Sequence, residues 1–336
     1  MLTARDLAKK LGVSISTVGR ALTDDPRISA ETKERVRRAA DELGYVGSQP
    51  ARMMRGGSSN LIGLLLPDVQ NDFYASIAQA LSVCCDRQGY QVVLSITGDD
   101  REAEARHVRD LVGSRVAGII IVPTASPRRE CRAFLGLVPH VQLLRHVDSL
   151  GETWFGIDDE AALAEATTCL LEKGHKRIAY AGGWEKLSTG AARKRGVQRA
   201  FEEAGADLSD LQLFLGAPTI ESGEAVVKEI LASRDRPTAI ISGSVHVTLG
   251  VLNAVSEEKI LVPEELSIVG FGDPAWFAWW GPGLTTIRPP IQSLATTCGL
   301  WFLDQMRDRE TGNSQAPHHS VSQSKLIERG SVATPG

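Results

Sequence analysis

Small polar residues and one arginine are grouped in the segment Ser14–Arg20, and their types are suited to reading DNA. Ser14, Ser16 and Thr17 lie beside Ile15, and Arg20 follows about one helical turn later. An α-helix fits the DNA major groove, where the residues at its start reach the base edges. Arginine can bond guanine, hydroxyl groups bond bases or phosphates, and isoleucine can contact a thymine methyl group. The segment predicts a DNA-reading helix, although the pattern alone also fits a helix that only packs.

Three helices are predicted to position this segment within residues 1–45. Thr3 and Asp6 have the spacing of a capping box at the start of a first helix. A turn follows, and the polar segment described above forms the second helix. Ser29 caps a third helix, which ends at Gly44. This is the order of elements in a helix-turn-helix domain.

Basic residues are concentrated at the N-terminal end of a chain that is acidic overall. The 336 residues carry a formal net charge of −4. Residues 1–58 contain 11 Lys and Arg against 7 Asp and Glu, a net charge of +4, which leaves −8 for the remainder. A basic module joined to an acidic body is typical of a nucleic-acid-binding domain with a second function attached.

A linker and then a large α/β body follow. Residues 46–59 contain Pro50 and the run Gly56-Gly57-Ser58-Ser59, which predicts a linker around one short hinge helix. From Leu61, apolar segments of strand length alternate with helical patterns in two successive series. This alternation predicts two lobes of doubly wound parallel sheet with helices on both faces. The lobes within 60–336 are expected at about 60–159 with 288–318, and at about 160–287 with 319–332.

The sequence contains no motif for a metal, a cofactor or a catalytic centre. Five cysteines lack metal-ligand spacing and are expected to be buried thiols in a reducing compartment: Cys84, Cys85, Cys131, Cys169 and Cys298. A Gly-x-Gly-x-x-Gly motif, a phosphate loop and a nucleophile elbow with triad partners are missing. The start of the chain is polar from Thr3, and the apolar runs are too short to span a membrane. We therefore expect a cytoplasmic protein that is not an enzyme.

The chain resembles the LacI/GalR family of transcription regulators from residue 2 to about 332. In the N-terminal part, the resemblance lies in Asp6-Leu7-Ala8-Lys9-Lys10-Leu11-Gly12-Val13-Ser14, Ser16-Thr17-Val18, Arg20-Ala21-Leu22, Asp25-Pro26-Arg27-Ile28-Ser29 and Ala39-Ala40-Asp41-Glu42-Leu43-Gly44-Tyr45. In the body it lies in Ile62-Gly63-Leu64, Gly89-Tyr90, Val116-Ala117-Gly118-Ile119-Ile120, Gly174-His175-Lys176-Arg177-Ile178, Val262-Pro263-Glu264, Ser267-Ile268-Val269-Gly270-Phe271 and Leu284-Thr285-Thr286-Ile287.

The resemblance implies a repressor of a carbohydrate or related catabolic operon. It implies a periplasmic-binding-protein-like body with a small-molecule effector between its lobes. It also implies a homodimer or higher assembly that binds a palindromic operator, because the symmetry of a dimer is mirrored in its DNA site. No cofactor and no membrane partner are implied.

The resemblance assigns the expected DNA contacts. In the family, the hinge helix inserts an apolar side chain into the minor groove, and Met54 stands here in place of the usual leucine. Arg52 and Arg55 flank it, and Tyr45 matches a phosphate contact. Gly19 replaces the usual serine of the reading helix. The expected DNA-binding residues are Ser14, Ile15, Ser16, Thr17, Arg20, Arg27, Tyr45, Arg52, Met54 and Arg55.

The resemblance also implies an effector cleft at the carboxyl ends of the strands. Phe73 and Tyr74 match positions where an aromatic ring stacks on the ligand, and Arg193 matches an arginine that bonds the ligand's polar groups. The expected effector-binding residues are Phe73, Tyr74, Thr124, Arg145, Asp158, Thr189, Arg193, His246, Asp273 and Trp276.

Two positions of this cleft depart from the family pattern. Val245 and Gly272 stand where the family usually carries aspartates, whereas the basic residues are retained. Guanidinium groups bind carboxylates and phosphates through paired hydrogen bonds. The loss of acids therefore favours an anionic effector, such as a sugar acid or a phosphorylated sugar. The alternative is a neutral sugar held by Asp158 and Asp273.

Two further alternatives stay open. Among the aromatic residues at 276–280, Trp276 could stack on the ligand, or the group could pack within a lobe. A two-lobed body would also serve a solute-binding or sensor protein that does not regulate DNA. The basic first 58 residues and the lack of a signal peptide argue against that second function.

Overall fold

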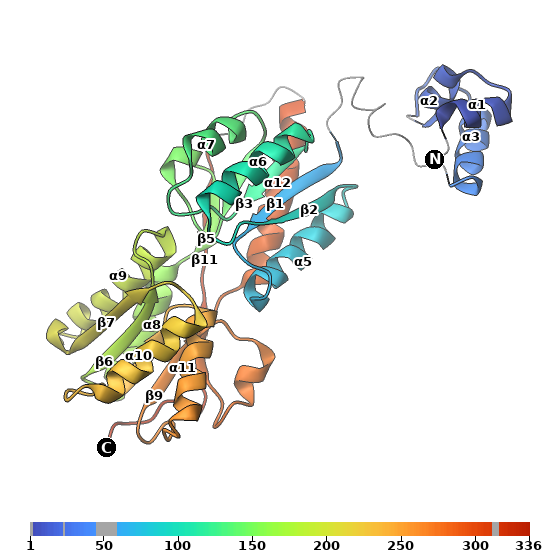
Figure 1. Cartoon of the computed structure of the whole chain (residues 1–336). Coiled ribbons are helices and arrows are strands. Elements are labelled where there is room, and N and C mark those ends of the chain that lie inside the picture. The colour runs from blue at the N-terminus through green and yellow to red at the C-terminus, as the bar shows by residue number, and fades with distance from the viewer. Residues whose placement is uncertain (1–2, 23, 45–58, 311–315) are drawn as a thin grey trace. The chain divides into compact units, whose positions relative to one another are not determined.

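The computed structural model describes residues 3–22, 24–44, 59–310 and 316–336. It divides into two compact units, 1–59 and 60–336, which are described separately. Tyr45, Arg52, Met54, Arg55 and the expected hinge helix lie outside the described residues. Figure 1 shows the elements of both units. No helix in the described ranges has the length and apolar character needed to cross a membrane.

The first unit is a bundle of three helices, α1 (Ala4–Leu11), α2 (Ile15–Leu22) and α3 (Ala30–Glu42). Thr3 and Asp6 form the expected capping box of α1, and the Ser29 side chain accepts a hydrogen bond from Thr32 N at the start of α3. The buried side chains are Leu7, Ala8, Val18, Ala21, Val36, Ala39 and Ala40. All three helices contribute to this core, which fixes the orientation of α2.

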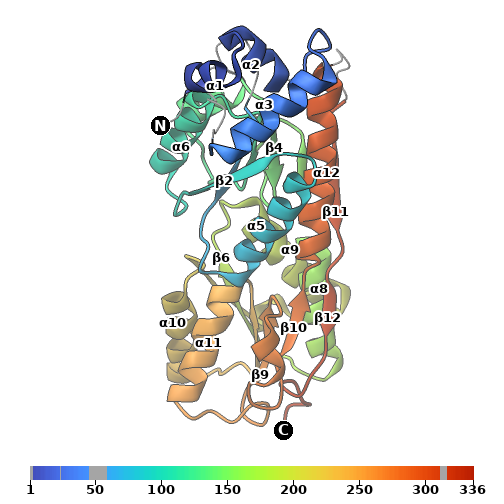
Figure 2. The ribbon, with the colours of Figure 1, turned by 90° about the vertical axis from the view of Figure 1, so that its right-hand side faces the viewer.

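The first lobe of unit 60–336 contains a six-stranded parallel sheet in the order β11-β5-β4-β3-β1-β2. Its strands are β1 (Leu61–Leu66), β2 (Gln91–Ile96), β3 (Gly118–Ile121), β4 (His140–Leu143), β5 (Trp154–Ile157) and β11 (His319–Ser322). Helices α5 (Asp72–Asp86) and α12 (Ile291–Glu310) pack side by side on one face, as Figure 2 shows. Helices α6 (Arg101–Gly113) and α7 (Arg129–Leu135) cover the other face.

The second lobe contains a six-stranded sheet in the order β12-β10-β9-β8-β6-β7. Its strands are β6 (Ile178–Gly183), β7 (Leu211–Gly216), β8 (Ala239–Ser242), β9 (Ser267–Phe271), β10 (Thr285–Arg288) and β12 (Lys325–Ile327). They run parallel, except that β12 is antiparallel to β10. Helices α8 (Asp159–Glu172) and α9 (Ser188–Glu203) cover one face, and α10 (Ile220–Ala232) and α11 (Val245–Glu257) cover the other. The predicted α/β fold class is confirmed.

The chain passes between the lobes three times: after β5, after β10 and after β11. The third passage differs from the sequence expectation, which ended the first lobe at about 318. Strand β11 pairs with β5 from His319 to Ser322, so the first sheet extends four residues further. A short polar strand such as β11 carries too little apolar pattern for its sheet to be predicted from sequence.

Candidate functional site

Helix α2 presents polar residues on the side opposite its packing face. Val18 and Ala21 are buried, whereas Ser14, Ser16 and Arg20 are exposed and Ile15 is 48 % exposed. The Ser14 hydroxyl accepts a hydrogen bond from Thr17 N at 3.0 Å and lies 2.7 Å from Ser16 Oγ. The first turn is therefore closed by its own hydroxyl groups, and an exposed apolar side chain stands among them. This surface can form hydrogen bonds and one apolar contact with base edges.

Arg27, in the connection between α2 and α3, is held by a neighbouring carboxylate. Its Nη2 lies 2.6 Å from Asp25 Oδ2, and its Nε donates to Asp25 Oδ1 at 2.9 Å. Hydrogen bonds from Arg27 hold the pKa of the Asp25 carboxyl well below its ordinary value. The pair orients an exposed guanidinium group, whose remaining N–H donors are suited to a phosphate.

A pocket lies between the two lobes of unit 60–336, and the ends of seven strands contribute to it. Pro67 and Asp68 follow β1, Asp99 follows β2, and Arg145 follows β4. From the second lobe come Gly183 of β6, Pro218 after β7, the segment 243–246 after β8, and Phe271 of β9. Ligands of open α/β sheets bind outside the carboxyl ends of the strands, which is where this pocket lies.

Arg145 is the buried base of the first lobe, with 8 % of its side chain exposed. Its guanidinium group bonds both carboxylate oxygens of Asp99, with Nη2 3.2 Å from Oδ2. Nη2 also donates to the Tyr74 hydroxyl at 3.3 Å. Burial raises the pKa of Tyr74, so its hydroxyl stays protonated at neutral pH. This wall of the pocket therefore combines a paired guanidinium group with a neutral phenol.

Arg193, on α9, is the corresponding base of the second lobe. Its Nε donates to Asp159 Oδ1 at 2.7 Å, and its Nη1 donates to the Gly243 carbonyl oxygen at 2.6 Å. The guanidinium carbon lies 4.0 Å from the centre of the Phe271 ring. Burial raises the pKa of Asp159, and the charge of Arg193 opposes that rise. The arrangement holds the guanidinium group over the Phe271 ring and leaves its remaining donors for a ligand.

Two polar contacts join the lobes at the rim of this pocket. His246 Nε2 on α11 lies 3.6 Å from Asp68 Oδ2, which belongs to the first lobe. The His146 backbone N–H donates to Ser188 Oγ, at the start of α9, at 3.1 Å. Because these contacts link residues of different lobes, they must break or lengthen when the lobes separate.

The charges of the described lining residues are balanced. Asp68 and Asp99 face the pocket together with Arg145 and Arg193, and the buried Asp159 stands behind Arg193. The surplus of bases expected from the sequence is therefore not found in this lining. The expectation counted the missing acids at 245 and 272 but not the carboxylates that follow β1, β2 and β5.

Six of the expected effector-binding residues line this pocket: Phe73, Tyr74, Arg145, Thr189, Arg193 and His246. Thr124 does not. It is buried beside the pocket, where its N–H and hydroxyl donate to the Glu104 carboxylate at 2.7 and 2.9 Å. Asp158 does not line it either, because its side chain caps α8 through Ala161 N and accepts from Gln323 at 3.0 Å. Its neighbour Asp159 is the carboxylate that meets Arg193.

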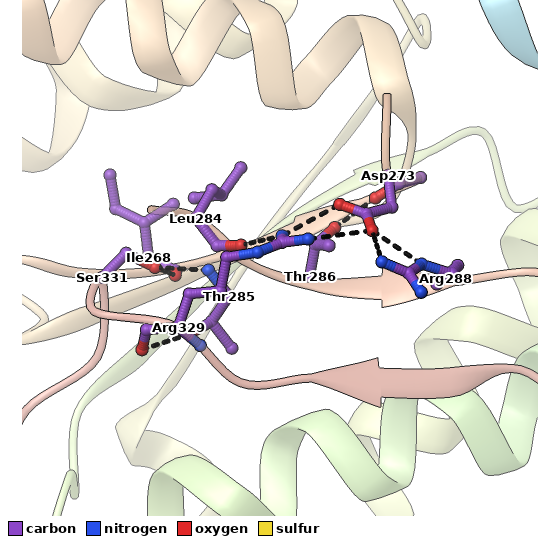
Figure 3. A network of polar contacts seen from close by, with 9 residues as sticks. Ile268, Asp273, Leu284, Thr285, Thr286, Arg288, Arg329 and Ser331 are labelled. Atoms are coloured by element: carbon purple, nitrogen blue, oxygen red, sulfur yellow. Dashed lines mark hydrogen bonds and ion pairs between the residues drawn. The ribbon is translucent and has the colours of Figure 1, made fainter. Parts of the chain in front are cut away.

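Asp273 does not line this pocket either. Figure 3 shows its carboxylate directed at Arg288 and Arg329. Its carboxylate, 4 % exposed, bonds Arg288 on β10 and Arg329, with Arg329 Nη1 2.9 Å from Oδ1. These guanidinium groups lower the pKa of Asp273 despite its burial. Ser331 donates to Ile268 O at 2.7 Å and accepts from Thr285 N at 2.8 Å, so the same region anchors the C-terminal segment. Asp273 thus has a structural position in the second lobe.

The aromatic group at 276–280 lies outside this pocket. Trp276 contacts Phe277 edge-on, with 4.4 Å between ring centres, and packs on the core beside α10 and α11. Trp279 is 78 % exposed. Of the two interpretations of this group, the structure favours packing for Trp276 and gives Trp279 a surface position.

Sequence reasoning missed several residues that line the pocket or support it, among them Asp68, Asp99, Phe271 and Asp159. Asp68 and Asp99 lie within three residues of the ends of β1 and β2, and Phe271 is the last residue of β9. Each could have been found by listing the residues at the carboxyl ends of all the predicted strands. Asp159 could not be separated from Asp158 without knowing where α8 begins.

Two family models match this chain. Residues 3–48 match a model described as bacterial regulatory proteins, lacI family. Residues 167–332 match a periplasmic binding protein-like domain. The first match covers the helical unit, and the second covers most of the second lobe.

Complete proteins of the same organisation are also similar. The HTH-type transcriptional regulator MalR of Streptomyces coelicolor is 33 % identical over 98 % of this chain and 97 % of its own length. The HTH-type transcriptional regulator GalS of Salmonella typhimurium is 29 % identical over 88 % of this chain and 87 % of its own length. A crystal structure of the lac repressor dimer, bound to operator and the anti-inducer ONPF, has a TM-score of 0.84 at 24 % identity and covers 99 % of both chains. That last likeness concerns the fold.

Proposed function

Because this chain belongs to the lacI family of bacterial regulatory proteins, we propose that it is a dimeric repressor controlled by a small polar molecule in the interlobe pocket. The chain is a DNA-binding transcriptional regulator. Beyond this, we propose that it represses transcription, that its effector binds between the lobes, and that the effector is a small polar molecule. Carbohydrate or related catabolic genes are the proposed targets.

The observation that carries the proposal is the exposed surface of α2. Its core side is fixed by Val18 and Ala21, and its other side presents hydroxyl groups, Ile15 and Arg20. The isoleucine among these hydroxyl groups can contact a thymine methyl group. Ser14, Ser16 and Thr17 are proposed to bond bases and phosphates, with Arg27 as a phosphate contact. Tyr45, Arg52, Met54 and Arg55 complete the proposed DNA surface from outside the described residues.

A second copy of the chain is the proposed partner of two exposed apolar surfaces. Val83 on α5, Leu94 and Ile96 on the edge strand β2, and Leu300 on α12 are exposed on the first lobe. Trp279 is exposed on the second lobe. Exposed edge strands and tryptophans are typical of protein interfaces. A dimer would cover them and carry two reading helices to the two halves of a palindrome.

The pocket supports a compact oxygenated effector. Arg193 in the second lobe and the Tyr74 hydroxyl, which accepts from Arg145 in the first lobe, offer hydrogen bonds to ligand oxygens, and Phe73 and Phe271 offer apolar contact. Because the lining acids balance the bases, a neutral or singly charged ligand fits better than a dianionic phosphate ester. Sugars and sugar acids are therefore proposed ahead of phosphorylated sugars. Binding would favour the joined arrangement of the lobes and so shift the affinity for DNA.

Selection of DNA from a random library by the intact chain tests the regulator. The expected product is a palindrome, bound with an affinity that falls as salt rises, because phosphate contacts release counterions. The variant carrying Ile15→Ala and Ser16→Ala should lose most of this sequence preference and keep its salt dependence. Selection of no shared sequence by the wild-type protein would refute the proposal.

A thermal-shift panel tests the effector. Neutral sugars, sugar acids and sugar phosphates should be compared at equal concentration with the intact chain. The proposal expects the stabilising compounds among the first two groups and no stabilisation of the Arg193→Met variant by them. Stabilisation by the phosphates alone would contradict the proposed class.

A further inference from the structure

A second groove adjoins the interlobe pocket, and the two share a wall. Phe73 and Val245 line both hollows, and Gly272 lines the groove. These three residues, called the pocket wall below, come from α5, α11 and the end of β9. The wall therefore includes both lobes, and Phe73 and Val245 are among the residues that a ligand in the pocket can contact.

Gly272 fixes the position of Val245. Its backbone has φ +84°, a conformation that favours glycine. A Cβ added at Gly272 would lie 2.6 Å from Val245 Cγ2, closer than two carbon atoms can approach. The valine side chain therefore rests directly on the α-carbon of Gly272. Any larger residue at 272 would displace Val245, and the space towards which it could move includes the pocket.

No side chain of the pocket wall can accept a hydrogen bond. Phe73 and Val245 are apolar, and Gly272 has no side chain. The Gly272 N–H donates to Ile287 O at 2.9 Å, and its carbonyl oxygen accepts from the Thr286 hydroxyl. The carboxylate next in the chain, Asp273, is engaged by Arg288 and Arg329, as Figure 3 shows. A ligand hydroxyl facing the wall would lose its water and find no acceptor for its proton.

We propose that the effector is a deoxygenated sugar or sugar acid, whose C–H edge faces the pocket wall and whose oxygens face Arg193 and the Tyr74 hydroxyl held by Arg145. The inference rests on the proposed function of this pocket. Val245 is the specificity-determining residue, because its methyl groups form the contact, and Gly272 is a positioning residue. The missing hydroxyl removes the group that the wall cannot satisfy, while Arg193 and the Tyr74 hydroxyl bond the remaining oxygens.

Matched pairs that differ by one hydroxyl test this inference on the intact chain by titration calorimetry. Suitable pairs are D-galactose with D-fucose, L-mannose with L-rhamnose, D-ribose with 2-deoxy-D-ribose, and D-galactonate with D-fuconate. The deoxy member of at least one pair should bind about five- to a hundredfold more tightly, the range expected for one unsatisfied buried hydroxyl. Tighter or equal binding of the hydroxylated member in every pair would overturn the inference. The inference would also be overturned if the protein bound no sugar of the panel.

The Val245→Thr variant tests the wall itself. Threonine has nearly the shape of valine and adds one hydroxyl that can accept a hydrogen bond. The preference for the deoxy member should shrink at least fivefold or reverse, whereas Val69→Thr, at an exposed position, should leave it unchanged. An unchanged preference in Val245→Thr would overturn the role of Val245.

The positioning role of Gly272 has a matched control at Gly89. Gly89 has φ +80°, and an added Cβ there would have no neighbour within 4 Å. Both alanine variants carry the same backbone strain, but only Gly272→Ala displaces Val245. Gly272→Ala should bind the deoxy sugar at least fivefold more weakly than Gly89→Ala does, and equal affinities would overturn the positioning role of Gly272.

In each of these experiments, palindrome binding by the ligand-free protein is measured as well. Loss of palindrome binding would count against the proposed function. If the protein still binds the palindrome but shows no preference for a deoxy sugar, only this inference fails.

Discussion

Arg193 shows how a single residue links the stability of the second lobe to ligand binding. It neutralises the buried Asp159, bonds a backbone carbonyl and lies on the Phe271 ring. A buried carboxylate is costly unless it is paired, so the fold requires this arginine before any ligand arrives. The ligand then meets a guanidinium group that is already oriented, and this lowers the entropy cost of binding.

Arg193→Met should therefore lower both ligand affinity and stability. The free energy of unfolding should fall by about 3–5 kcal/mol at neutral pH, because Asp159 is left buried without a partner. Without Arg193, the folded-state pKa of Asp159 rises further above its unfolded value. The loss should therefore be smallest at low pH and should grow as pH rises through the carboxyl range. Urea unfolding followed by tryptophan fluorescence measures this, since all six tryptophans lie in 60–336.

Arg195→Met is the matched control for that prediction. Arg195 lies on the same helix and pairs with Glu160 at 3.0 Å, but its side chain is exposed. Its removal should cost less than about 1 kcal/mol. Equal losses in the two variants would show that the Arg193 pair is not the stabilising element described here.

Asp273→Asn should destabilise the second lobe without altering ligand affinity. Its pKa in the folded protein is lowered, so its two ion pairs add stability above the ordinary carboxyl pKa, and that stability is lost as pH falls through the folded pKa. The variant should lose about 1–3 kcal/mol at neutral pH, since one of its partners is half exposed. The difference from wild type should narrow in acid. Asp304→Asn, which removes an exposed pair with Arg307, should cost almost nothing.

The types of residue at the pocket could be predicted from the sequence more reliably than the individual residues that line it. The resemblance to the family placed Phe73 and Arg193 at the pocket, and both line it, as do Arg145 after β4 and His246 at the start of α11. It did not indicate that Thr124 bonds Glu104, which lies in the first turn of α6, 20 residues earlier in the chain. Which of two adjacent polar residues faces a pocket depends on one residue of helix phase, and periodicity does not resolve that.

At the scale of elements, helix pairs in the second lobe pack through glycines. A Cβ added to Gly250 on α11 would overlap the carbonyl oxygen of Ile220 at the start of α10. The backbones of the two helices are therefore in contact at this point. Neither glycine spacing nor apolar pattern in the sequence indicated which helices would meet so closely.

Gly250→Ala should separate α10 from α11 and lower the free energy of unfolding by about 1–3 kcal/mol or more. Gly113→Ala is the matched control, because Gly113 lies in α6 and an added Cβ there meets nothing within 4 Å. The control should be neutral or stabilise by up to about 1 kcal/mol, as alanine favours helix more than glycine does. Equal destabilisation by both would contradict the close approach. Urea unfolding of the two variants decides between these outcomes.

The two sides of α2 should respond differently to alanine. Ser16→Ala removes an exposed hydroxyl and should weaken operator binding by roughly fivefold or more, with little change in stability. Val18→Ala removes buried methyl groups and should lower the stability of the first unit by about 1–3 kcal/mol. Operator titration and far-ultraviolet thermal unfolding measure the two effects. A Ser16→Ala variant with unchanged affinity would exclude this side of α2 from DNA reading.

At the scale of the whole molecule, the order of the helical unit and the two lobes could be predicted from the sequence, whereas the contacts between the lobes could not. The three-helix unit and the two α/β lobes follow from capping residues and apolar periodicity, which act over short distances. The three passages between the lobes allow their carboxyl edges to face one shared pocket. Contacts across that pocket, such as His246 with Asp68, join residues far apart in sequence and needed the structure to be seen.

The central claim is that occupancy of the pocket and occupancy of the operator are thermodynamically linked. The most direct test is the operator Kd of the intact chain, measured by fluorescence anisotropy with and without a saturating ligand from the thermal-shift panel. The account predicts about a 5–150-fold change in operator Kd and an equal change in ligand Kd when operator is bound, because coupling is reciprocal. Arg193→Met should abolish the ligand's effect while retaining operator binding. A ligand that stabilises the wild-type body and leaves its operator Kd unchanged would contradict the account.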